Sequence, residues 1–287
     1  MERARNDVCW CGSGQKYKKC HLECDEHIAL LREQGAVVPP HYLMKTEEQI
    51  AGIRAASQFT RYVLDMVEQR IVPGVTTEDI NQWVHEYTVS RGAYPAPLNY
   101  RGFPKSVCTS VNEQVCHGIP DAYVLEEGDI INVDVTTLVG GYYGDASRTF
   151  LIGECRQEAE TIARVARECM ELGIAQVKPF AHVGDVGAAI EAHANAHGFS
   201  VVREYGGHGI GSEFHDHFYL PHYGEAGRGA VLLPNMVFTV EPMINAGAWQ
   251  CRLLANRWTA VTVDGRLSAQ WEHTVRVTME GVEILSA

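Results

Sequence analysis

The chain has 287 residues, of which 46% are hydrophobic and 21% charged, the balance of an ordinary globular protein. Its formal net charge of −12 excludes nucleic-acid or anionic-membrane binding over the whole surface, although local basic patches remain open. No apolar run approaches the roughly 20 residues that span a bilayer, and the N-terminus has no apolar stretch typical of a signal peptide. We therefore expect a cytoplasmic protein without membrane contact, whose nine cysteines are reduced thiols or metal ligands.

The first 24 residues contain four of these cysteines, in the stretch CWCGSGQKYKKCH at 9–21 and at position 24. Three thiols and one imidazole can complete the closed tetrahedral shell of a structural zinc ion. The spacing resembles the SEC-C motif, and the resemblance implies one zinc ion held by Cys9, Cys11, Cys20 and His21. Free thiols on a disordered tail are the alternative. We interpret residues 1–24 as a SEC-C-like zinc module and 25–44 as a linker that ends at a Pro-Pro pair.

The chain after residue 45 is predicted to consist of two halves with the same order of helices and strands. Helices are predicted at 46–71, where Thr46 and Gln49 have capping-box spacing, and at 76–92, 156–177 and 183–198. Strand-like runs follow each helix pair, at 106–111, 128–138 and 142–152 and then at 200–204, 236–241, 250–254, 257–263 and 270–279. The repeated order of helix, helix and sheet indicates an α+β fold with an internal pseudo-repeat.

An acidic hairpin is predicted in the stretch DIINVDVTTLVGGYYGD at 129–145. Asp134 shares a strand face with Thr136, because alternate residues of a strand point the same way. If Gly140-Gly141 forms a two-residue turn, Thr136 lies opposite Asp145, and the two carboxylates come within roughly 7 Å on one face. An ionised carboxylate in an apolar setting is costly unless it is compensated. The pair can therefore share divalent ions, or both can be solvated.

Three later stretches place further ligand-type residues beside apolar runs. GGHGIGSEFHDHF at 206–218 contains His208 and His215, MVFTVEPMI at 236–244 contains Glu241, and SAQWEHTVRV at 268–277 contains Glu272. Each residue alone is commonly a solvated or core side chain. Two Asp, two Glu and one His together are hard to accommodate in a core without metal.

These motifs, with NYRGFPKSVCTSVNEQVCHGIPD at 99–121, resemble in order and separation those of type I methionine aminopeptidases over residues 44–284. The resemblance implies a pita-bread catalytic domain at 45–287. It also implies removal of the N-terminal methionine from nascent proteins whose second residue is small, by a metal-activated water. Two divalent ions of Co, Mn, Fe or Zn suit a set of carboxylates and imidazole.

The resemblance also implies a role for each site residue. Asp145 and Glu272 bridge the two ions, and Glu241 is both a ligand and the proton shuttle. His117 and His215 contact the substrate amide and the tetrahedral intermediate. The metal ligands are Asp134, Asp145, His208, Glu241 and Glu272, and the methionine pocket is formed by Tyr100, Phe103, Cys108, Phe214 and Trp258. Ordinary core packing is the alternative for the aromatic residues, and Pro97 departs from some relatives at the pocket.

Further predictions concern the partners of the chain, its oligomeric state and its class of activity. The module at 1–23 has five basic residues against three acidic ones, which suits docking to a ribosome, although a solvated face is the alternative. The chain is expected to be a monomer. A proline-specific pita-bread peptidase usually carries a large preceding domain, and a catalytically dead relative loses metal ligands. All five ligands are present here.

Overall fold

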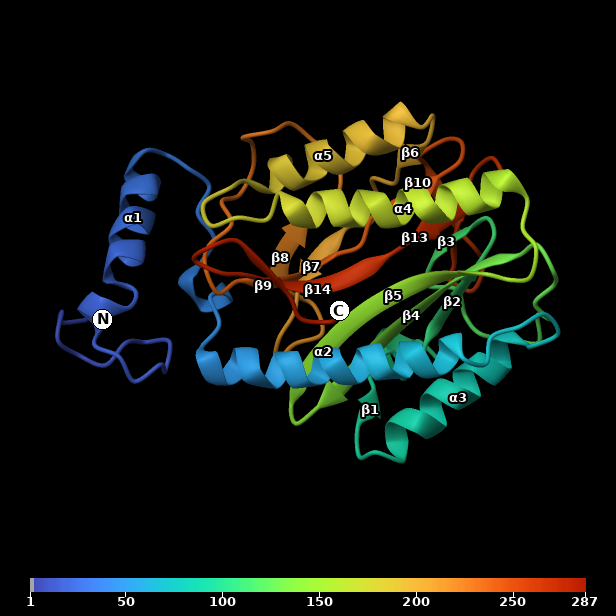
Figure 1. Cartoon of the computed structure of the whole chain (residues 1–287), viewed down its shortest axis with the longest axis horizontal. Coiled ribbons are helices and arrows are strands. Elements are labelled where there is room, and N and C mark those ends of the chain that lie inside the picture. The colour runs from blue at the N-terminus through green and yellow to red at the C-terminus, as the bar shows by residue number, and fades with distance from the viewer. Residues whose placement is uncertain (1–2) are drawn as a thin grey trace.

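The computed structural model describes residues 3–287, and each half of the catalytic region contributes a helix pair and strands of a central sheet (Figure 1). The helices are α1 Leu22–Glu33, α2 Glu47–Glu68, α3 Thr77–Val89, α4 Gln157–Ala175 and α5 Val183–Ala196, with short 3-10 helices at Tyr17–Lys19, His41–Leu43 and Tyr100–Gly102. The strands are β1 Tyr94–Pro95, β2 Cys108–Val111, β3 Gln114–Cys116, β4 Ile130–Val139, β5 Tyr142–Leu151, β6 Ser200–Val201, β7 Gly207–Gly209, β8 Asp216–Leu220, β9 Val237–Val240, β10 Met243–Asn245, β11 Cys251–Leu253, β12 Ala260–Thr262, β13 Ser268–Gln270, β14 Glu272–Val277 and β15 Val282–Ile284.

The four helices predicted after residue 45 all form, and each ends two or three residues before its predicted end. The capping box at the start of α2 is confirmed, because the Thr46 hydroxyl accepts from the Gln49 backbone N–H and the Gln49 side chain accepts from the Thr46 N–H. None of the helices in residues 3–287 is long and apolar enough to cross a membrane.

A nine-stranded sheet has the order β1-β4-β5-β14-β9-β7-β8, with β15 added beside β14 and β2 beside β4. Two three-stranded sheets, β13-β10-β6 and β11-β12-β3, complete the fold. The sequence did not predict β1, β3, β7, β8, β10, β13 or β15, because strands of two to five residues are too short to show a clear alternation.

The β4–β5 hairpin has the predicted register. Thr136 pairs with Asp145 in an antiparallel ladder that runs unbroken from the Ile130–Leu151 pair to the turn. Gly140 and Gly141 form the two-residue turn with φ of 58° and 88°, a conformation that favours glycine at both positions.

The helices cover one face of the sheet. Val133, Val135 and Ala146 pack into the core formed with α2 and α3, and Val275 and Phe238 pack into the core formed with α4 and α5. Their sequence neighbours point away from the helices because strand side chains alternate. The opposite face of the sheet therefore receives the acidic residues of both halves.

Residues 25–44, predicted as a linker, contain most of α1 (Figure 1). Cys24 and Ile28 are buried in the same core cluster as α4 and α5, and Leu31 packs against it. Val37 forms a parallel bridge with Ala230. The apolar residues at 24, 28 and 31 have the spacing of one helix face, which indicates a helix here. The linker was predicted from composition and the Pro-Pro pair, without this spacing.

Candidate metal centre and substrate cavity

A cavity of about 320 Å³ opens on the face of the sheet that the helices leave free. It gathers every predicted site residue of the catalytic region, from both halves of the chain. Its lining includes Tyr100, Phe103, Cys108, His117, Asp134, Asp145, His208, Phe214, His215, Glu241, Trp258 and Glu272.

The ligand-type side chains converge at its base. Oxygen atoms of Asp145 and Glu272 and a nitrogen of His208 lie within 4.8 Å of one another. The Nε2 atom of His208 is 3.6 Å from Oδ2 of Asp145 and 3.7 Å from Oε1 of Glu241. Asp134 lines the same cavity. The two halves of the sheet thus bring four carboxylates and one imidazole to one point.

Electrostatics make this cluster unfavourable without a cation. Burial, together with the charges of Asp145 and Glu241, raises the pKa of Asp134 and that of Glu272 well above the usual range. Burial also raises the pKa of Glu241 to about 7, against the lowering influence of His208 and Thr239. A divalent cation compensates such crowded carboxylates, and oxygen and imidazole donors suit divalent transition metals. The residues therefore fit a metal centre.

His208 is oriented by its backbone surroundings. Its Nδ1 lies 3.1 Å from the carbonyl oxygen of Gly209, which can only accept, so Nδ1 carries the proton and Nε2 keeps its lone pair for a metal. A Cβ at Gly207 would collide with the carbonyl oxygen of Thr239, so only glycine lets β7 lie this close to β9. This explains the glycine that precedes His208.

Three residues that the sequence analysis missed hold Glu241. The Thr239 hydroxyl donates to one of its oxygens at 2.7 Å, and the Gln270 amide donates to the other at 3.2 Å. The Glu241 backbone N–H donates to Nε2 of His222 at 3.1 Å. Thr239 and Gln270 each precede an acidic residue of the site by two positions. For Thr239, this same-face spacing was the signal that could have identified it, whereas Gln270 ends β13 and Glu272 begins β14, so the contact of Gln270 with Glu241 depends on the tertiary fold.

Both predicted substrate histidines are neutral at neutral pH. Burial, reinforced by the charge of His208, lowers the pKa of His117 to about 4 and that of His215 to about 3. The His215 ring lies between His208, 4.1 Å away, and Tyr100, 5.2 Å away. His117 has a φ of 55°, an uncommon value for a residue other than glycine. Each neutral imidazole presents one N–H donor.

An aromatic pocket adjoins the ligands. Phe103 meets Trp258 edge to face at 5.2 Å, and Tyr100 packs against Phe214 at 4.7 Å. Cys108 is buried beside them. Cavity residues that the sequence analysis did not assign are Arg101, Thr136, Glu204, Tyr205, Gly206, Tyr219 and Met243, and Pro97 also lines it. The cavity thus combines an aromatic wall with polar side chains.

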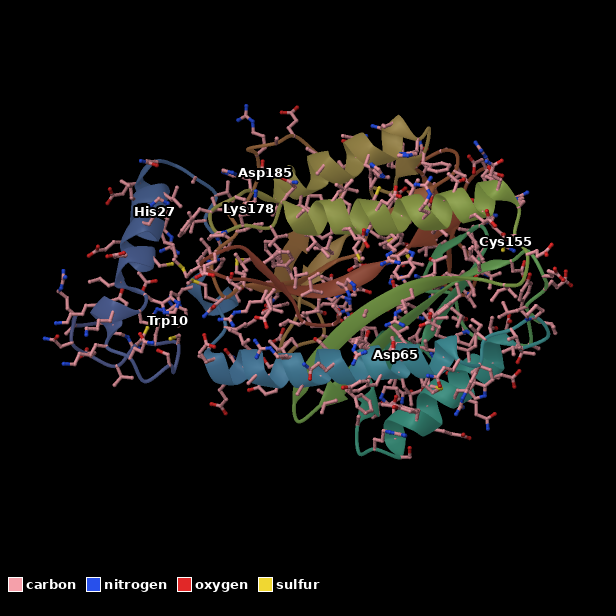
Figure 2. The ribbon with its side chains drawn as sticks, in the orientation of Figure 1. Trp10, His27, Asp65, Cys155, Lys178 and Asp185 are labelled. Atoms are coloured by element: carbon pink, nitrogen blue, oxygen red, sulfur yellow. The ribbon has the colours of Figure 1, made fainter. Side chains whose placement is uncertain are left out.

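The N-terminal cysteines also converge. Nδ1 of His21 is 3.2 Å from Sγ of Cys9 and 3.1 Å from Sγ of Cys20, and the Cys11 and Cys20 sulfurs are 3.5 Å apart. All four ligand atoms lie within 4.8 Å of one another. Trp10, labelled in Figure 2, packs against both this cluster and the main core. The arrangement fits a closed zinc site.

Comparisons with known proteins agree with this geometry. Metallopeptidase family M24 matches residues 51–279, and the SEC-C motif matches residues 5–23. Methionine aminopeptidase A of Synechocystis sp. is 53% identical over 84% of this chain and 96% of its own length. The methionine aminopeptidase of Chlamydia pneumoniae is 43% identical, and the match covers 98% of each chain.

Solved structures show the same fold. The methionine aminopeptidase of Rickettsia prowazekii matches with a TM-score of 0.84 and 45% identity, over 85% of this chain and 99% of its own. Prolidase from Pyrococcus furiosus, at 18% identity and a TM-score of 0.65, shares the pita-bread fold alone. The chain therefore belongs to metallopeptidase family M24 and, within it, to the methionine aminopeptidases.

Proposed function

We propose that this metal-dependent hydrolase removes the N-terminal methionine from nascent polypeptides whose second residue is small, acting as a monomer in the cytoplasm. One observation carries the proposal: a single cavity joins five metal-ligand side chains, two of them buried and three half-buried, to an apolar pocket. The relatives named above, at 43–53% identity, are methionine aminopeptidases and support the same substrate.

Two divalent ions of Co, Mn, Fe or Zn would be held by Asp134, Asp145, His208, Glu241 and Glu272. Asp145 and Glu272 would bridge the ions, Asp134 would complete one shell, and His208 with Glu241 the other. The convergence of oxygen and nitrogen atoms around Asp145 supports this assignment. When bound, such a pair of ions activates a water molecule and stabilises an oxyanion.

Glu241 is suited to move the proton of the reaction. A carboxylate can act as a general base toward an attacking water, and Glu241 lines the cavity beside the other ligand residues. Thr239 and Gln270 hold its two oxygens, so the group keeps one orientation while it does so. The proton taken from the attacking water would pass through Glu241 to the departing amine.

His117 and His215 would donate hydrogen bonds to the substrate. Because both are neutral, each offers an N–H without adding a charge to the cavity. Donors aimed at the oxygen that gains charge during amide attack stabilise the transition state by several kcal/mol, about 3 for one donor. The two rings lie on the cavity wall, His215 against His208 and His117 edge-on to Trp258 at 6.3 Å.

The methionine side chain would occupy the pocket of Tyr100, Phe103, Cys108, Phe214 and Trp258. Its unbranched, polarisable thioether packs well against aromatic rings. Paired edge-to-face and tilted rings give the pocket fixed walls, which favours one side-chain shape.

The N-terminal module would hold one structural zinc ion through Cys9, Cys11, Cys20 and His21, and residues 45–287 would form the catalytic domain. The module would dock the enzyme to the ribosome. Its basic side chains Arg3, Arg5, Lys16, Lys18 and Lys19 are all exposed, and they support attraction to ribosomal RNA.

Peptide hydrolysis tests the function. Met-Gly-Met-Met should be cleaved after methionine when a divalent metal is added, and a Xaa-Pro peptide should not. Cleavage of the Xaa-Pro peptide alone would overturn the proposal in favour of a proline-specific peptidase. Hydrolysis of neither peptide at any metal concentration would favour an inactive binding protein. Release of methionine before Lys or Phe at a similar rate would contradict the small-residue specificity.

A further inference from the structure

Helices α4 and α5 lie side by side over the second half of the sheet (Figure 1). Three metal-ligand side chains meet on their outer surface: Glu168 of α4, His193 of α5 and His197 at the C-terminal end of α5. One ligand atom from each lies within 4.8 Å of the other two. We propose that these residues bind a divalent transition metal ion of the zinc class, in a site separate from the catalytic cavity and the cysteine cluster.

The spacing of the two histidines supports the site. Residues four apart on a helix lie on the same face, and the ring centroids of His193 and His197 are 4.5 Å apart. Glu168 reaches the pair from the adjacent helix, with Oε2 2.8 Å from Nε2 of His193. Two imidazoles and one carboxylate suit Zn²⁺, Ni²⁺ or Cu²⁺ better than Mg²⁺ or Ca²⁺.

Neighbouring groups already orient the donors. Nδ1 of His197 lies 3.0 Å from the carbonyl oxygen of His193, so Nδ1 carries the proton and Nε2 keeps its lone pair. Arg164 donates to Oε1 of Glu168 at 2.6 Å and leaves Oε2 for the site. Metal would replace the proton between His193 Nε2 and Glu168 Oε2, and that proton would pass to His193 Nδ1 or to water.

The exposure of the three ligand side chains determines how the ion would be coordinated and what it would stabilise. Glu168 and His193 are half-buried and His197 is exposed, so a fourth ligand position would be filled by water. The ion would link α4 to α5, and a ligand that binds only the folded state raises its stability. The apolar core beneath, with Ile162, Val165 and Ile190, does not depend on these three side chains. Substitutions of the ligands should therefore leave the fold intact.

Zinc content of the full chain tests the proposal. The unaltered protein and each variant are dialysed against the same micromolar buffered free zinc, and bound zinc is measured by mass spectrometry. His197→Gln and His193→Gln should each bind one zinc fewer per chain, because the catalytic and cysteine sites are common to all samples. Glu168→Gln should need a higher free zinc concentration to reach the same content. The matched controls are Glu171→Gln on α4 and His27→Gln on α1, both outside the cluster, and they should bind as much zinc as the unaltered protein.

Thermal unfolding supplies a second readout. Added zinc should raise the unfolding midpoint of the unaltered protein and of both control variants by more than that of His197→Gln. Peptide hydrolysis and circular dichroism should remain unchanged in His197→Gln, which shows that the variant folds. Equal zinc content and an equal midpoint shift in the unaltered protein and His197→Gln would overturn the proposal. The cluster would then consist only of the His193–Glu168 hydrogen bond and the ring contact between His193 and His197.

Discussion

The Thr136 hydroxyl donates a hydrogen bond of 2.8 Å to Oδ1 of Asp145 directly across the β4–β5 hairpin. The other carboxylate oxygen, Oδ2, is the one that faces Nε2 of His208. Thr136 therefore fixes the carboxylate orientation with one oxygen toward the metal ligands. It acts through Asp145 and is a positioning residue.

Thr136→Val should weaken metal binding by about 10- to 100-fold, the usual effect of removing an outer hydrogen bond from a metal ligand. Valine keeps the shape and loses the hydroxyl. Metal titration followed by calorimetry measures the affinity, and Thr136→Ser is the matched control because it retains the donor. Equal affinities for Thr136→Val and Thr136→Ser would show that the hydrogen bond does not orient Asp145.

Asp145→Asn and Glu272→Gln should each abolish peptide hydrolysis, because a bridging carboxylate serves both ions and a neutral amide cannot. Both side chains are almost fully buried, so solvent cannot replace the lost charge. Steady-state turnover of Met-Gly-Met-Met under saturating metal measures the effect. Near-normal turnover of Asp145→Asn would rule out its bridging role.

His117→Ala should lower kcat far more than it raises KM, since a hydrogen bond that strengthens in the transition state contributes little to substrate binding. Loss of one donor of this kind costs about 100-fold or more in kcat. Kinetics at several substrate concentrations separate the two parameters. A raised KM with unchanged kcat would assign His117 to binding alone.

The hairpin and the helices were predictable because their signals are local. Paired glycines set the β4–β5 turn, and the alternation of Val133 and Val135 placed Asp134 on the opposite face. The motifs supplied the ligands by resemblance. The holding groups of Glu241 were missed, because His222 and Gln270 come from other segments and their role depends on the tertiary fold.

The N-terminal cysteine module gives a separate metal prediction. Cys9→Ser combined with Cys20→Ser should remove one zinc ion per chain and unfold residues 3–21, since so short a segment buries too little apolar surface to fold alone. Hydrolysis of a short peptide should change little. Elemental analysis measures the zinc, and Cys155→Ser, which lies at the far end of the molecule (Figure 2), is the control. Unchanged zinc content in the double variant would exclude the site.

We propose that a pair of metal ions compensates the buried carboxylates of the two halves. Anomalous diffraction from crystals grown with Mn²⁺, recorded at the manganese absorption edge, tests it most directly. We expect two anomalous peaks roughly 4 Å apart, both in contact with Asp145 and Glu272, with one beside Asp134 and the other beside His208 and Glu241. No peak in the cavity, or a single ion that does not touch Asp145, would contradict it.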